Sequence, residues 1–140
     1  MSRSTGTFDH CIHLPGELRA ARRARHHVAG ALRSRGWAET DVERAMLAVS
    51  ELVANAVVHG RSDVRLRLRL GDGLRIEVTD RRPAAAVHRR ALDPRRTRGR
   101  GLQLVDHMSR AWGVARSAGS KTVWCELEPG AADTQVTATA

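Results

Sequence analysis

Residues 45–58 read AMLAVSELVANAVV and contain only three polar side chains, Ser50, Glu51 and Asn55. Apolar residues recur along this segment at three- and four-residue steps, which predicts a helix packed on one face. Glu51 and Asn55 are four positions apart, so they lie one above the other on another face of that helix. An unpaired buried amide costs about 1–3 kcal/mol, and an unpaired carboxylate costs more. We therefore expect a metal ion, water or phosphate in front of these two side chains.

The composition indicates a single small globular domain. The chain has 140 residues, 41% of them apolar, with one phenylalanine, three tryptophans and no tyrosine. Such a chain can bury a core, which we expect to consist mostly of valine, leucine and alanine. No apolar run approaches the roughly 18 residues of a membrane-spanning helix, and the first residues lack the apolar core of a signal peptide. We therefore expect this protein to be soluble and cytoplasmic, with no membrane partner.

The two cysteines, Cys11 and Cys125, lie in predicted strands. Their spacing matches no zinc-binding pattern. We expect two small buried side chains that stay reduced.

The formal net charge is +9, and residues 81–100 alone contain eight arginines against one acid, Asp93. Such a charge suggests nucleic acid, a membrane surface or an acidic partner. Here the excess is confined to one predicted loop, and aromatic residues suitable for base stacking are scarce. Nucleic acid is therefore the weakest of the candidate partners.

Hydrophobic periodicity predicts the order β-α-α-β-β-loop-α-β-β. The predicted segments are a strand at 8–14, helices at 17–35 and 41–58 with Thr40 or Asp41 as cap, strands at 63–70 and 74–80, a helix from 99, and strands at 111–116 and 121–128. This order predicts a two-layer α/β sandwich of the α+β class, whose mixed, mostly antiparallel sheet carries its helices on one face. The predicted boundaries are a flexible N-terminus at 1–7, one domain at 8–128 with a lid at 81–98, and a disordered tail at 129–140.

Four polar features could form one site. They are the Glu51–Asn55 pair, Asp80 at the end of a buried strand, the GRG sequence at 99–101 before a helix, and Thr122 at the start of the last strand. Each also has a plain explanation. The helix pair can bond to itself, Asp80 can be a turn residue, the glycines can form a hinge, and threonine is common in strands.

Taken together, these residue types suit a metal-bound nucleotide. A glycine-rich helix N-terminus offers backbone N–H groups to phosphate. A strand-end carboxylate can accept a hydrogen bond from the amino group of a purine, and an amide oxygen is a suitable ligand for Mg²⁺. A carboxylate one helical turn from that ligand can orient or deprotonate an attacking hydroxyl group.

The segments ELVANAVVHG (51–60), IEVTDRRP (76–83), GRGLQLVDHMSRAWGV (99–114) and KTVWCEL (121–127) resemble the GHKL ATPase superfamily. The chain is similar to its short single-domain members, the bacterial anti-sigma-factor serine kinases, over roughly residues 10–128. The resemblance implies a Bergerat ATP-binding fold.

The resemblance also implies a site for ATP and Mg²⁺, with Glu51 as the general base and Asn55 as the metal ligand. The other implied nucleotide contacts are Asp80 at the adenine amino group, Arg98 and Arg100 near the phosphates, Gly99 and Gly101 at the phosphate-binding end of the lid, and Thr122 in the adenine pocket. The implied partners are a sigma factor and an anti-anti-sigma protein of the STAS type, whose serine accepts the phosphoryl group. A homodimer is compatible with the resemblance.

One departure from the family pattern concerns the residues after Asp80. The family often has glycines there, in the pattern DxGxG, whereas this chain reads DRRPAAAV. Glycines allow the backbone to approach a nucleotide closely. Two hypotheses therefore remain open: an ATP-dependent protein kinase, and a non-catalytic, ATP-responsive interaction module of the same fold.

Overall fold

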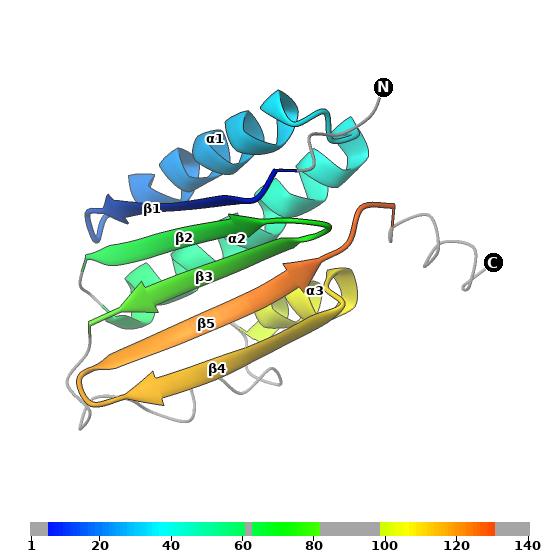
Figure 1. The fold of residues 1–140 in the computed structure, drawn as a ribbon. Coiled ribbons are helices and arrows are strands. Elements are labelled where there is room, and N and C mark those ends of the chain that lie inside the picture. Colours follow the sequence, from blue (N-terminus) through cyan, green and yellow to red (C-terminus); the bar gives the residue numbers. More distant parts are fainter. Residues whose placement is uncertain (1–5, 61–62, 82–98, 131–140) are drawn as a thin grey trace.

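The structure, a computed structural model, describes residues 6–60, 63–81 and 99–130 of the chain (Figure 1). The elements are β1 (Phe8–Leu14), α1 (Arg19–Ser34), α2 (Glu39–Gly60), β2 (Val64–Leu70), β3 (Leu74–Asp80), α3 (Gly99–Met108), β4 (Ala111–Ser117) and β5 (Ser120–Leu127). The predicted flexible N-terminus (1–7) and the predicted tail (129–140) lie largely outside the described residues, and the predicted lid (81–98) lies almost wholly outside them. Within the described residues, no helix is long and apolar enough to span a bilayer.

The strands form one five-stranded sheet in the order β1-β2-β3-β5-β4, and all neighbouring strands run antiparallel. The three helices lie against one face of this sheet, as Figure 1 shows. The predicted two-layer α+β class is thus confirmed, and in the described sheet every pairing is antiparallel.

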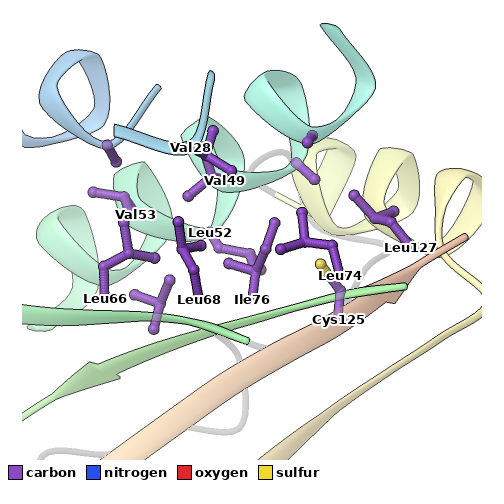
Figure 2. Packing of buried hydrophobic residues seen from close by; sticks show 14 of the residues in the cluster. Val28, Val49, Leu52, Val53, Leu66, Leu68, Leu74, Ile76, Cys125 and Leu127 are labelled. Carbon is purple, nitrogen blue, oxygen red and sulfur yellow. The ribbon is translucent and has the colours of Figure 1, made fainter. Parts of the chain in front are cut away.

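The period of two along the strands separates the two faces of the sheet. In β2, with the sequence VRLRLRL, all the apolar residues are buried and the arginines lie on the open face. Figure 2 shows Leu52 and Val53 of α2 on the side of the helix that faces Leu66, Leu68 and Ile76 of the sheet. Each of these five side chains is fully buried. The apolar stripe of α2 therefore fixes this helix over the centre of the sheet, and its polar flank is left for other contacts.

Two sequence predictions are corrected by the fold. The helix α2 begins at Glu39, so Asp41 lies inside its first turn. The Asp41 carboxylate instead accepts the backbone N–H of Gly130 at 3.0 Å. Cys11, predicted to be buried, is exposed on the open face of the sheet, opposite Arg67 of β2. Cys125 is buried as predicted, and desolvation raises the pKa of its thiol to about 12.

Candidate functional site

The flank of α2 that carries Glu51 and Asn55 faces α3. Arg44 precedes Glu51 by seven residues, so both lie on nearly the same line along the helix. The Arg44 guanidinium donates a hydrogen bond to the backbone carbonyl of Met108, the last residue of α3. The two helices contact each other and run in opposite directions (Figure 1). Beyond Arg44, this flank of α2 therefore follows α3 back toward the N-terminus of α3.

Asn55 is half-buried and carries an unsatisfied polar atom. Its Nδ2 is buried and has no hydrogen-bond partner in the described part of the chain. Glu51, one turn earlier, is also half-buried, but it does not accept this N–H group. The plain explanation, in which the two side chains satisfy each other, therefore does not account for the NH₂ end of the amide.

The residues at this position fit a magnesium ion bound chiefly by phosphate. The two ends of an asparagine amide exchange by a half-turn about the last side-chain bond, so Asn55 can present either Nδ2 or Oδ1 to the same space. Among the described residues no group of three or more histidine, cysteine or acidic side chains could hold a metal by itself. Mg²⁺ typically needs no such cage, because substrate phosphates and waters complete its coordination.

Asp80 is the last residue of β3 and lies directly opposite Lys121 of β5. Both side chains are 1% exposed, and Nζ of Lys121 lies 3.6 Å from Oδ2 of Asp80. Neither carboxylate oxygen of Asp80 accepts a hydrogen bond in the described part of the chain. The sequence prediction of a strand-end carboxylate is thus matched by a buried carboxylate, accompanied by a lysine that the prediction missed.

Thr122 lies on the opposite face of the sheet from Asp80. Its Oγ1 is 2.7 Å from Oγ1 of Thr79, its direct neighbour on β3. The burial of β5 alternates, so Lys121 shares the helix-covered face with Val123 while Thr122 does not. The structure therefore does not bring Thr122 to Asp80. The alternation of apolar residues in the last strand was the signal that could have identified Lys121.

The helix α3 begins at Gly99, as the sequence predicted, and its first turn contains the GRG sequence. The first backbone N–H groups of a helix have no partner within the helix and carry a partial positive charge. They can therefore bind phosphate oxygens. Arg98, the other predicted phosphate contact, lies outside the described residues.

These features come together at one end of the molecule. The helix α2 packs on β3, and β3 ends where β5 begins. Figure 1 shows that α2 also ends toward this end of the sheet, and that the N-terminal end of α3 is the end of that helix nearer to it. The Asp80 carboxylate and the C-terminal part of α2, which carries Asn55, thus lie on the helix-covered side at this sheet end, and the N-terminus of α3 points toward it.

A separate hollow of about 530 Å³ lies at this sheet end but on the open face. His13, Arg65 and Thr79 contribute to its lining, whereas Glu51, Asn55 and Asp80 do not. It is therefore distinct from the candidate site.

Comparison with known proteins agrees with this fold. The histidine kinase-like ATPase domain family matches residues 14–126. No curated protein matches the chain. A similar solved structure is that of the RsbU and RsbW domains of Rv1364c from Mycobacterium tuberculosis, with a TM-score of 0.68 and 22% identity, covering 87% of this chain. The present chain spans only 32% of the length of the chain in that structure. The resemblance to GHKL ATPases is thereby confirmed, and the chain belongs to the family of histidine kinase-like ATPase domains.

Proposed function

We propose that the protein binds ATP with Mg²⁺ and acts as an anti-sigma-factor-type serine/threonine kinase that regulates transcription. The acceptor in this proposal is a serine or threonine of an anti-anti-sigma partner of the STAS type. The observation that carries the proposal is the buried, unpartnered Nδ2 of Asn55, one turn from Glu51 on the flank of α2 that faces α3. Membership of the ATPase-domain family supports the choice of ATP.

Each site residue has a distinct role in this proposal. Asn55 would hold Mg²⁺, which neutralises phosphate charge when bound. Glu51 would accept the proton of the attacking hydroxyl group, because its half-buried carboxylate lies on the same flank of α2. The N–H groups at the start of α3, with Arg98 and Arg100, would bind the phosphates. Asp80 would accept a hydrogen bond from the base.

The partner in this proposal is inferred from the sequence resemblance to anti-sigma kinases. Those proteins act between a sigma factor and an anti-anti-sigma protein. We extend both partners, and a homodimeric assembly, to this chain as parts of the same proposal.

A second candidate is a non-catalytic module of the same fold that responds to ATP. Two observations favour it. The sequence after Asp80 lacks the glycines that are frequent in the family, and the Asp80 carboxylate already has Lys121 beside it. In such a module, bound nucleotide would change the lid and thereby a partner surface.

A phosphotransfer assay separates the two candidates. The protein is incubated with labelled Mg-ATP and a STAS-type partner encoded near its gene, and phosphoserine or phosphothreonine is measured on the partner. Glu51→Gln should abolish transfer and retain ATP binding, because the amide cannot accept the proton. The matched control is Glu43→Gln, an exposed position on the same helix.

Each outcome of this assay is informative. Equal transfer by Glu51→Gln and the wild type would contradict the role of Glu51 as base. ATP binding without transfer to any STAS-type partner would favour the non-catalytic module. Absence of ATP binding would contradict both candidates.

A further inference from the structure

Asp80 and Lys121 form a buried ion pair, and the proposed function gives a role to Asp80 but none to Lys121. On the helix-covered face of β3 and β5, the neighbouring cross-strand pairs are apolar: Val78 lies opposite Val123, and Ile76 lies opposite Cys125. The pair at the sheet end consists instead of a carboxylate and an ammonium group, each 1% exposed.

Stability alone does not explain this pair. Removing two charges from water costs about as much as their attraction returns, and apolar replacements of buried ion pairs are often neutral or stabilising. Another apolar pair would continue the pattern of Val78 and Val123 without that cost. A buried ion pair at the predicted base-binding position therefore suggests recognition of a ligand.

The Asp80 carboxylate is able to bind a third group, and Lys121 can donate to more than one acceptor because an ammonium group has three N–H donors. The separation of 3.6 Å between Nζ and Oδ2 exceeds the roughly 2.7–2.9 Å of a charge-assisted hydrogen bond. Both Asp80 oxygens accept no hydrogen bond within the described residues, so they can accept from a ligand. The Lys121 ammonium group carries three N–H donors on a flexible side chain and has no hydrogen-bond acceptor. Side by side, the two residues offer one acceptor and one donor.

An adenine base offers the complementary pair on one edge, where the amino group at C6 donates and the adjacent ring nitrogen N1 accepts. We propose that Lys121 contacts the base directly and determines specificity by donating to N1 while Asp80 accepts from the amino group. The proposal rests on ATP binding as proposed above and adds Lys121 as a second base-reading residue. The ligand class is a 6-aminopurine nucleotide with an unblocked N1.

The test compares nucleotide analogues on the wild-type protein by calorimetry in the presence of Mg²⁺. 1-Deaza-ATP replaces N1 by C–H, and 7-deaza-ATP makes the same change on the far side of the base. Loss of a hydrogen bond to a charged donor corresponds to about a tenfold or greater loss of affinity. We expect 1-deaza-ATP to bind at least about tenfold more weakly than ATP, and 7-deaza-ATP to bind within about threefold of ATP.

The variant Lys121→Met then assigns the effect to the lysine, because methionine retains much of the length of the side chain and removes the donor. In folded Lys121→Met, ATP and 1-deaza-ATP should bind equally. If the variant does not fold, the wild-type comparison still decides. Equal affinity of the wild type for ATP and 1-deaza-ATP overturns the inference, as does an unchanged preference in Lys121→Met. Binding of ATP in these cases leaves the proposed function intact, whereas no binding of ATP overturns both.

Discussion

At the scale of single residues, polar side chains in apolar surroundings were the readable signal. Glu51 and Asn55 interrupt an apolar helix pattern, and Asp80 ends a buried strand. The structure places the first two half-buried on α2 and Asp80 buried at the end of β3. Lys121 was missed because the family resemblance implied its neighbour Thr122 as the pocket residue of the last strand. In β5 the buried residues are at odd numbers, so Lys121 lies on the helix-covered face and Thr122 on the other. A lysine on an apolar face contradicts ordinary burial preferences, which is why pattern reasoning passes over it.

The buried pair predicts a strong energetic coupling between Asp80 and Lys121. Lys121→Met should lower the free energy of unfolding by about 3–5 kcal/mol, because it removes the opposite charge from beside a buried carboxylate. The double variant Asp80→Asn/Lys121→Met should recover most of this loss. Urea denaturation of the double-mutant cycle measures the coupling.

The matched control for this cycle is on the same two strands but on the other face. Thr79→Val and Thr122→Val, alone and together, remove a neutral, half-buried hydroxyl contact. Their coupling should not exceed about 1.5 kcal/mol. Additive effects of the Asp80 and Lys121 substitutions would show that the two groups do not interact as described.

At the scale of elements, hydrophobic periodicity was sufficient to predict every described helix and strand. The boundaries differed by one or two residues, as at α1, predicted from residue 17 and observed as Arg19–Ser34. The predicted cap was wrong because Asp41 binds the distant backbone of Gly130 instead of its own helix. Local sequence cannot reveal such a contact, since it depends on how the last strand brings the chain back to α2.

The packing of α2 predicts different costs for two leucines on the same helix. Leu52 is fully buried against the sheet, and Leu52→Ala should lower the free energy of unfolding by about 2–5 kcal/mol. Leu47 is 40% exposed, and Leu47→Ala should change the free energy of unfolding by less than about 1 kcal/mol. Chemical denaturation compares the two variants, and similar losses at both positions would contradict the assigned face of α2.

The contact between β1 and α1 predicts a dependence of stability on pH. Nδ1 of His10 lies 3.0 Å from Nε2 of His27, and the pKa of His27 is lowered from 6.5, first by desolvation and then by the nearby His10. The unfolded chain therefore binds a proton at higher pH than the folded chain. The stability that neutral His27 contributes to the folded state is complete above pH 6.5 and is lost as the pH falls through the lowered pKa of His27.

Thermal unfolding between pH 7.5 and 5.5 tests this dependence. The wild type should lose stability over this range, and His27→Gln should lose less. His26→Gln, at an exposed position one residue earlier, should behave like the wild type. A steeper loss in His27→Gln than in the wild type would contradict the assigned direction of the pKa.

At the scale of the whole molecule, the order of elements predicted the two-layer class, and the family comparison agrees. The strand order was not predictable in the same way. The strand β5 inserts between β3 and β4, so β3 pairs with a strand that follows about 40 residues later along the chain. This pairing depends on the packing of α3 and the last hairpin. It also places Lys121 beside Asp80.

The central claim is that Asn55 holds a metal-bound triphosphate at this sheet end, and a calorimetric titration of ATP tests it most directly. Wild type, Asn55→Ala and the control Ser50→Ala on the same helix are titrated with and without Mg²⁺. We expect the wild type and Ser50→Ala to bind Mg-ATP, and Asn55→Ala, folded as judged by circular dichroism, to bind at least about tenfold more weakly. No binding by the wild type, or equal Mg²⁺-dependent affinity in Asn55→Ala, would contradict the claim.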